Sequence, residues 1–330
     1  MLMKVHGLVD LQVNGYRGVD FSQADLTENT FASACREMLK SGATAFLPTI
    51  ITNADEVYAH NLPIMAQVLS KDEFQGRLLG IHLEGPFISS SEGARGIHNP
   101  QHIRQPDIFY LQRLIDISNH TVKLVTIAAE LEGADKLTRF AVENGIAVSL
   151  GHQMAGVGDL QKLADAGARA LTHLGNGIPL VVARHENPIF AGLSVDNLAT
   201  MMITDGNHLP MAIIKTIIRA KGVDNCIVTS DATALSGMPP GEYNNLGNKV
   251  ILDKTGRIYN PTTGYLAGSS ATMLDCMNHL ASLHLVGSDD LMAMAFYNPL
   301  RLIGIEPSQL PTEPKVRFDE EQSRFYMQGS

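Results

Sequence analysis

The chain has 330 residues, of which 45% are hydrophobic and 18% are charged, and a formal net charge of −9. This length suits one large domain or two small ones, and the composition excludes a disordered, fibrous or coiled-coil protein. The acidic balance argues against nucleic acid as a partner, because binding to a phosphate backbone needs a basic surface. No apolar run approaches the ~20 residues of a membrane span, and no signal peptide is recognisable, so we expect a soluble, cytoplasmic protein.

Eight short apolar runs, typical of buried parallel strands, recur along the chain. They lie at residues 8–13, 44–50, 78–83, 122–128, 146–150, 170–174, 200–203 and 226–229. Segments with helical periodicity separate most of them, at residues 29–40, 54–69, 107–117, 134–143, 158–166 and 209–219. Eight alternating strand–helix units predict an α/β protein with a (β/α)8 TIM-like barrel. A doubly wound open sheet is the alternative, although the chain has no glycine-rich dinucleotide-binding turn.

The remaining segments predict additions to this barrel. Residues 176–198 form a long link rich in Gly and Pro with a weaker helical signal, and residues 248–260 read as an inserted β-hairpin. The last helices are expected at residues 269–283 and 288–303. We therefore expect a barrel over residues 1–305 and a C-terminal β-hairpin tail over residues 306–330.

Polar residues stand at the ends of the predicted strands, where the active site of a barrel lies. Glu84, His152 and His173 make one carboxylate and two imidazoles, a common ligand set for a catalytic zinc that keeps a position open for water. Asp231 is a further carboxylate that could move a proton between that water and a leaving group. His82, two residues before Glu84, is either an inner hydrogen-bonding residue or a second ligand. The set predicts metal-assisted hydrolysis of an amide, an ester or a C–N bond.

The same residues belong to motifs that follow one another in the order of a known family. The motifs lie at residues 8–15, 82–87, 96–100, 151–152, 172–174, 205–208, 229–233 and 266–270, and the second reads His-Leu-Glu-Gly-Pro-Phe. From about residue 8 to residue 305 the chain resembles the N-acetylglucosamine-6-phosphate deacetylases of the amidohydrolase superfamily. The resemblance implies a barrel of the metal-dependent hydrolase type.

The resemblance also implies a role for each candidate residue. Glu84, His152 and His173 match the metal ligands of the family, and Asp231 matches its catalytic aspartate. The implied reaction converts N-acetylglucosamine 6-phosphate to glucosamine 6-phosphate and acetate, with a metal-activated water as nucleophile and Asp231 as general base and acid. His98 matches a contact near the acyl group, and His208 and Arg184 match the phosphate contacts. The other positions that match substrate contacts are Asn176, Gly177, Leu266, Ala267 and Gly268.

Two residues at the end of the first predicted strand indicate how many metal ions the site binds. Gln12 and Asn14 stand where many superfamily members carry a His-x-His pair, so they mark a vestigial second-metal position. Neutral amides are poor transition-metal ligands beside imidazole, and we therefore expect one divalent metal ion. Zinc is the first expectation, and iron, cobalt or manganese would also suit the ligand set.

The chain departs from the family pattern in three places. We expect a short form that lacks the family's N-terminal strands, with the tail hairpin as the remnant of a small β-sandwich domain. Glycines at 175 and 177 suggest a roomier or more mobile pocket, and two residues more than in the family pattern precede Pro188 after Arg184. Two alternatives therefore stay open: an amidohydrolase acting on a different N-acyl amino sugar or N-acyl compound, and a non-catalytic sugar-phosphate binding protein.

The expected partners follow from the same resemblance. The substrate is a phosphorylated N-acetyl amino sugar, and neither nucleic acid nor a membrane is expected. The family also implies a homodimer, in which a residue of the phosphate site, His208 or Arg184, could come from the neighbouring subunit.

Overall fold

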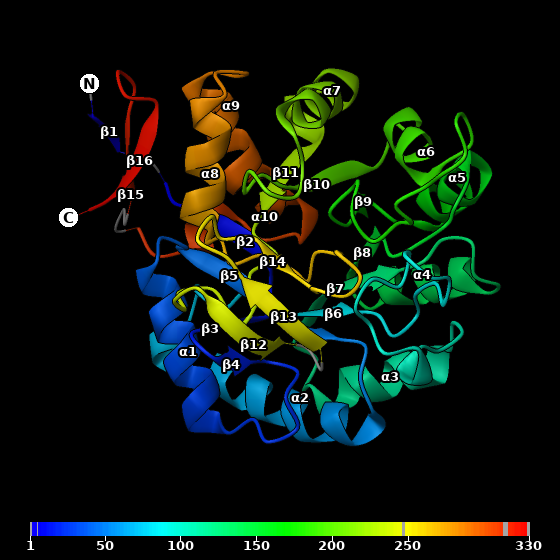
Figure 1. Ribbon diagram of the computed structural model, residues 1–330. Coiled ribbons are helices and arrows are strands. Elements are labelled where there is room, and N and C mark those ends of the chain that lie inside the picture. The colour runs from blue at the N-terminus through cyan, green and yellow to red at the C-terminus, as the bar shows by residue number, and fades with distance from the viewer. Residues whose placement is uncertain (1, 5, 246–247, 313–315, 329–330) are drawn as a thin grey trace.

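The computed structural model describes the chain except for residues 1, 5, 246–247, 313–315 and 329–330. Its centre is an eight-stranded parallel sheet that curls into a nearly closed barrel (Figure 1). The strands are Val9–Val13 (β2), Ala45–Ile51 (β5), Ile81–Glu84 (β6), Val122–Ile127 (β7), Ala147–Leu150 (β8), Ala170–Leu171 (β9), Ala199–Ile203 (β10) and Cys226–Thr229 (β11). Their order from β2 to β11 follows the sequence, which confirms the predicted barrel and its eight strands.

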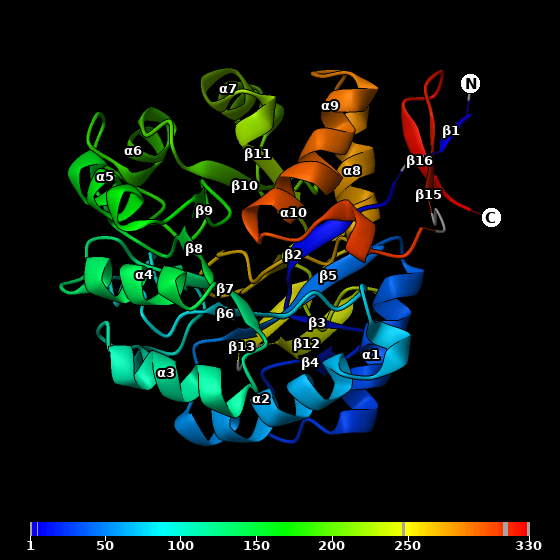
Figure 2. The same cartoon turned by 180° about the vertical axis from the view of Figure 1, so that it is seen from behind.

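Helices surround the barrel, as the view from behind also shows (Figure 2). They are Glu28–Lys40 (α1), Asp55–Leu69 (α2), Ile108–Ile117 (α3), Ala134–Glu143 (α4), Val157–Ala166 (α5), Pro188–Ser194 (α6), Met211–Lys221 (α7), Met273–Ser282 (α8), Ser288–Met292 (α9) and Asn298–Leu302 (α10). The predicted helices are confirmed, except that a π-helical turn, Ala293–Tyr297, divides the helix expected at residues 288–303 into α9 and α10. Within the described part of the chain, no helix has both the length and the apolar character that crossing a membrane requires.

The barrel interior holds a polar layer directly beneath the carboxyl ends of the strands. His82 is fully buried, its Nδ1 donates to the carbonyl oxygen of Leu11 (3.1 Å), and its Nε2 accepts from the hydroxyl of Thr126 (2.8 Å). The Thr126 hydroxyl also contacts that of Thr172 (2.9 Å), which donates to Ser149 (2.6 Å). Both ring nitrogens of His82 therefore form hydrogen bonds with residues inside the barrel, so His82 is an inner hydrogen-bonding residue.

The barrel closes between its first and last strands. The backbone N–H of Asn14 donates to the carbonyl oxygen of Ala232 (2.7 Å), and Val13 forms a parallel bridge with Ala232. Just beyond β2, the strands Gly15–Tyr16 (β3) and Val19–Asp20 (β4) form a short antiparallel ribbon. This closure brings the residues after β2 and those after β11 to the same side of the barrel opening.

An antiparallel sheet is inserted after β11. It consists of Gly241–Asn245 (β12), Asn248–Leu252 (β13) and Ile258–Tyr259 (β14), so the hairpin predicted at residues 248–260 is confirmed. The strand β12 was not predicted, because glycine and asparagine are poor strand formers and the segment contains three of them. The sheet has a small apolar cluster of its own, made by Leu235, Val250, Leu252, Ile258 and Ala267.

A second sheet joins the two ends of the chain. The tail hairpin, Val316–Asp319 (β15) and Arg324–Met327 (β16), is confirmed, and Leu2–Lys4 (β1) pairs with β15 in antiparallel fashion. The short β1 was not expected, because three residues are too few to carry a strand pattern. The description of this appendage as the remnant of a β-sandwich domain stays a prediction.

Candidate active site

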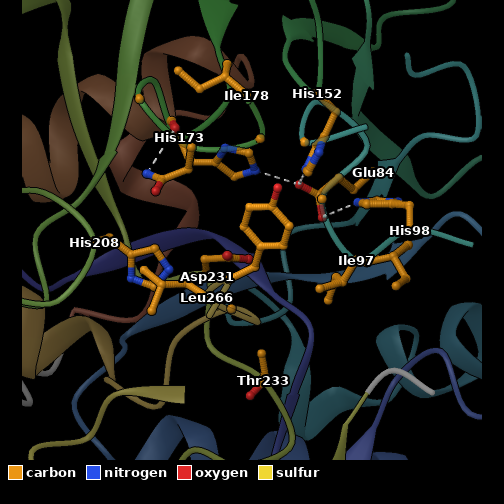
Figure 3. A pocket seen from close by; sticks show the side chains of 18 of the residues that line it. Glu84, Ile97, His98, His152, His173, Ile178, His208, Asp231, Thr233 and Leu266 are labelled. Carbon is orange, nitrogen blue, oxygen red and sulfur yellow. Dashed lines mark hydrogen bonds and ion pairs between the residues drawn. The ribbon is translucent and has the colours of Figure 1, made fainter. Parts of the chain in front are cut away.

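A cavity of about 340 Å³ lies at the carboxyl ends of the barrel strands (Figure 3). Its volume lies in the range of small-molecule sites. The candidate residues that line it are Asn14, Glu84, His98, His152, His173, Asn176, Gly177, His208, Asp231, Leu266 and Gly268. Gln12 and Ala267 are buried beside it, whereas Arg184 is exposed and is not among the described residues that line it.

Glu84, His152 and His173 converge on one point of the cavity (Figure 3). The Nε2 atoms of His152 and His173 lie 3.1 Å and 2.9 Å from Oε1 of Glu84. All three side chains are buried, and the two imidazole rings are nearly perpendicular. Glu84 ends β6, while the histidines follow β8 and β9 by a residue or two. The fold thus brings together the three candidate ligands that the strand ends had suggested.

The backbone aims these side chains by adopting an unusual conformation. His152, His173 and Asp231 have φ angles of 50°, 28° and 52°, in the left-handed region that non-glycine residues seldom occupy. Each stands just after a barrel strand, and a left-handed residue there turns the side chain inward over the opening. Such strain costs on the order of 1–3 kcal/mol per residue and clusters at functional sites, so its appearance at three candidate residues supports their assignment.

The hydrogen bonds of His152 test whether these residues fit a metal ion. Its Nδ1 donates to the carbonyl oxygen of Ala94 (2.9 Å), so in the neutral ring Nε2 carries the lone pair. That lone pair then faces a carboxylate oxygen of Glu84 at 3.1 Å, and two acceptors at this distance need a cation between them. A divalent metal ion or an added proton meets this need. The donor set therefore fits a metal ion.

The carboxyl group of Glu84 is held in its ionised form. Burial acts to raise the pKa of Glu84, but its close contacts with the imidazoles of His152 and His173 outweigh burial and hold that pKa well below the ordinary range. The same pairing raises the pKa of His173. Burial acts to lower that pKa, but the hydrogen bond to Glu84 outweighs burial. The site thus combines a buried anion with two imidazoles.

His98, which the sequence suggested as a substrate contact, also faces this cluster. Its Nε2 lies 3.9 Å from Oε2 of Glu84, and its ring centroid lies 4.4 Å from that of His152. Potential ligand atoms of Glu84, His98 and His152 all lie within 4.8 Å of one another. Two overlapping metal sites are therefore available, in which Glu84 and His152 are joined by either His173 or His98. The contact of His173 with Glu84 is shorter by 1.0 Å, from 3.9 Å to 2.9 Å.

Asp231 is fixed by the side-chain amides of Asn14 and Gln12. Its Oδ1 accepts hydrogen bonds from Nδ2 of Asn14 (2.8 Å) and Nε2 of Gln12 (2.9 Å). The same nitrogen of Gln12 donates to Oε1 of Glu84 (2.7 Å). Burial, together with the negative charge of Glu84, raises the pKa of Asp231 to about 6. A carboxylate with a pKa near the working pH is suited to accept and return a proton.

His208 lies across the cavity from Glu84 (Figure 3). Its Nδ1 pairs with Oδ2 of Asp205 (2.8 Å), an oxygen that also accepts from the hydroxyl of Ser269 (3.1 Å). Burial acts to raise the pKa of Asp205, but the bond and the charge of His208 lower that pKa to about 2. Asp205 therefore holds the ring by one nitrogen and leaves Nε2 for a ligand.

The glycines after His173 do not open the pocket as the sequence suggested. A Cβ on Gly177 would come within 2.8 Å of Nδ1 of His152, and one on Gly175 within 2.9 Å of a methyl group of Leu209. Both glycines also have positive φ angles, 96° at Gly175 and 60° at Gly177. The side chains of His152 and Leu209 therefore fill the space that a side chain at Gly177 or Gly175 would take. The expectation of a roomier pocket is wrong at these two positions.

Sequence reasoning missed several residues that line the cavity. The arginine among the described lining residues is Arg257, beside β14, whose guanidinium lies 4.8 Å from the ring centroid of Tyr259. Tyr265, Thr233 and Ile178 also line it. The only signal for Arg257 was its place in the inserted hairpin, and no sequence pattern links that hairpin to the barrel opening.

The chain is similar to several known proteins over most of its length. No family model matches it. The human N-acetylglucosamine-6-phosphate deacetylase is 34% identical over 318 residues, covering 92% of this chain and 75% of that protein. The N-acetylgalactosamine-6-phosphate deacetylase of Escherichia coli O157:H7 is 29% identical, covering 90% of this chain and 77% of that protein.

A solved structure agrees with these relatives. It is an aspartate-to-alanine variant of the N-acetyl-D-glucosamine-6-phosphate deacetylase of Mycobacterium smegmatis, in complex with N-acetyl-D-glucosamine-6-phosphate. Its TM-score is 0.85 at 27% identity, and the superposition covers 98% of this chain and 84% of that one.

Proposed function

We propose that this chain, which belongs to the N-acetylglucosamine-6-phosphate deacetylase family, hydrolyses the acetamide of N-acetylglucosamine 6-phosphate to glucosamine 6-phosphate and acetate. The observation that carries the proposal is the convergence of His152 and His173 on Glu84, with Asp231 bonded to the same Gln12 amide. A metal-dependent amide hydrolase needs this combination of a buried ligand set and an independent proton acceptor.

Glu84, His152 and His173 are the residues that would hold one divalent metal ion. When bound, such an ion supplies Lewis-acid polarisation of the amide carbonyl and lowers the pKa of water to about 7. We assign the third position to His173 because its nitrogen lies on the same oxygen of Glu84 as that of His152. His98 then remains beside the ligands as a contact for the acyl group. Zinc is the expected ion, and the ligand types would also accept iron, cobalt or manganese.

Asp231 moves the protons of the reaction. It accepts a proton from the attacking water as the new C–O bond forms, and it donates a proton to the amine nitrogen as the C–N bond breaks. Asn14 and Gln12 fix one of its oxygens by hydrogen bonds of 2.8 Å and 2.9 Å, which leaves the other oxygen for the proton. Each proton taken is returned, so the carboxylate ends the cycle as it began.

The phosphate group would be bound on the side of the cavity opposite the ligands. His208 presents Nε2 there because Asp205 holds its other nitrogen. Arg257 adds a permanent positive charge in the same cavity. Asn176, Gly177 and the residues 266–268 surround the space that the sugar would fill.

Arg184 lies outside the catalytic cavity of its own chain in this structure, so we propose that it serves the phosphate site of a second copy. It is exposed on the loop after β9, next to Leu180 and Val181, which are 76% and 88% exposed. Val181 does not line the catalytic cavity, and a large apolar side chain this exposed to water favours a surface that another molecule covers. We therefore propose a homodimer formed through this loop, to be checked by sedimentation at several protein concentrations.

The proposal is tested by acetate release from N-acetylglucosamine 6-phosphate with the metal-loaded protein and its Asp231→Asn variant. The variant keeps the shape of the carboxyl group and the three proposed ligands, so we expect full metal content and turnover lower by several orders of magnitude. Metal content measured on the same samples separates loss of chemistry from loss of the site. Near-normal turnover in the variant would overturn the role of Asp231.

A further inference from the structure

A second cavity lies beside the catalytic one, and no step of the proposed reaction uses it. Its volume is about 410 Å³, and its walls come from the β3–β4 ribbon, the end of β5, the residues 97–102 and β12. Ile51 and Ile97 line both cavities, so the two spaces share a wall. We call this second space the accessory pocket. Its polar lining residues include Asp20, Gln23, Asn99, His102, Asn244 and Asn245.

Asn245 brings an unmet hydrogen-bonding group to the accessory pocket. The residue is only 2% exposed, and its Nδ2 donates to the carbonyl oxygen of Ala267 (3.2 Å). Its Oδ1 has no partner among the described residues. Buried polar atoms in folded proteins are almost always paired, with protein, water or a ligand. This acceptor is therefore unpaired within the described part of the chain, beside a pocket wide enough to admit a hydrogen-bond donor.

Asp20 presents a second acceptor. Within the described residues its carboxylate accepts one hydrogen bond, from the backbone N–H of Ser22 (2.8 Å). Burial raises the pKa of Asp20 to about 6, and this single bond opposes the rise. A carboxylate can accept about four hydrogen bonds, so most of its capacity is unused.

The charge of the accessory pocket limits what can bind. Among its described lining residues there is no lysine or arginine, and Asp20 supplies one negative charge. A phosphate or carboxylate ligand would therefore be repelled. The side-chain amides of Asn99 and Asn244 offer donors, while Asp20 and Asn245 offer acceptors. A neutral molecule with several hydroxyl groups matches both kinds of group, because each hydroxyl can donate and accept.

We propose that the accessory pocket binds a neutral sugar or a similar polyol next to the catalytic cavity. Its volume lies within the range of small-molecule sites. The accessory pocket is also connected to the loop at residues 266–268. Asn245 donates to the carbonyl oxygen of Ala267, and the neighbours Leu266 and Gly268 line the catalytic cavity. The inference goes beyond the proposed function, whose reaction needs no second ligand.

The test is a titration of the metal-loaded protein with methyl β-D-glucopyranoside, followed by saturation-transfer NMR. This probe has neither an acetamide nor a phosphate, so it is not a substrate of the proposed reaction. The titration is repeated with glucosamine 6-phosphate present to fill the catalytic cavity. We expect saturable binding with a Kd of about 1–10 mM, as a small neutral ligand with a few hydrogen bonds would show, and we expect it to persist in the second titration.

Three variants identify the bound site. Asp20→Asn replaces the carboxylate with an amide of the same shape, and Asn244→Ala removes an exposed amide from the wall, so both should fold. Each should weaken probe binding about fivefold to tenfold, the value of one hydrogen bond. Asp25→Asn makes the same chemical change at an exposed neighbouring position and should leave the Kd unchanged.

Three results would overturn the proposal. The first is binding that does not saturate up to about 50 mM probe, an affinity far weaker than a built site would show. The second is displacement of the probe by glucosamine 6-phosphate. The third is an equal Kd for the probe in all three variants. The first would mean that the pocket holds only water. Failure of glucosamine 6-phosphate to bind would count against the proposed function alone, because the titration without it reads the accessory pocket independently.

Discussion

Gly177→Ala should disturb the proposed metal site without changing a ligand. A Cβ at this position would lie 2.8 Å from Nδ1 of His152, and the ring would have to move by about 0.6 Å to reach an ordinary contact of 3.4 Å. That movement disturbs the 2.9 Å hydrogen bond to Ala94, which sets the direction of Nε2. Because misplacement by about 1 Å can cost about 100-fold in rate, we expect turnover to fall by about one to two orders of magnitude.

The backbone contributes a separate effect, which a matched variant removes. Gly177 has a φ of 60°, where a side chain costs roughly 1–2 kcal/mol of folding free energy. Gly145 has a φ of 72°, and a Cβ there would meet no atom within 4 Å. Gly145→Ala therefore carries the same backbone cost with no contact to the site.

The assay compares the two variants by thermal unfolding, zinc content and acetate release. Both should lose similar stability, and only Gly177→Ala should lose zinc affinity and turnover. Equal zinc content and equal turnover in the two variants would refute the argument that Gly177 makes room for His152.

Three further predictions concern other residues of the cavity. Arg257→Ala should raise KM for N-acetylglucosamine 6-phosphate about tenfold and leave the unphosphorylated sugar unaffected, as one lost charged hydrogen bond implies, whereas the exposed Arg219→Ala should change neither value in steady-state kinetics. His173→Ala should lose bound metal and turnover together, while His98→Ala should keep the metal; metal analysis giving the reverse would assign the third ligand to His98. The folded-state pKa of Asp205, about 2, lies below its ordinary value of 3.8, so its ionisation stabilises the fold above about pH 4, and this contribution fades as the pH falls through 2. In the metal-free protein, urea unfolding should show Asp205→Asn less stable by about 2 kcal/mol at pH 7, with about half of that difference remaining at pH 3; a difference that does not change with pH would contradict this.

The sequence predicted those parts of the site that follow from strand ends. Parallel strands in a barrel bring their carboxyl ends to one opening, so Glu84, His152 and Asp231 could be grouped before any coordinates were known. The apolar strands and the periodic helices predicted the barrel for the same reason, because both patterns are local. The inner role of His82 was left open, since strand direction alone does not tell a ligand from a core residue.

The parts that the sequence did not predict depend on packing between distant segments. Arg257 and Tyr265 reach the cavity because the inserted sheet folds over the barrel opening, and no local pattern encodes that placement. The left-handed backbone of His173 could not be predicted, because a positive φ angle is uncommon for histidine, as it is for other non-glycine residues. Gly177 was misread because its neighbour His152 lies 25 residues away in the chain. The accessory pocket combines five segments that are far apart in the sequence, so no local pattern predicts it.

The most direct test of the account measures acetate release by the zinc-loaded protein on two substrates side by side. They are N-acetylglucosamine 6-phosphate and unphosphorylated N-acetylglucosamine, with N-acetylgalactosamine 6-phosphate as a third arm for the sugar isomer. The account predicts zinc-dependent release from N-acetylglucosamine 6-phosphate and a strong preference for it over the unphosphorylated sugar. Equal rates on the first two substrates, or no release from either, would contradict it.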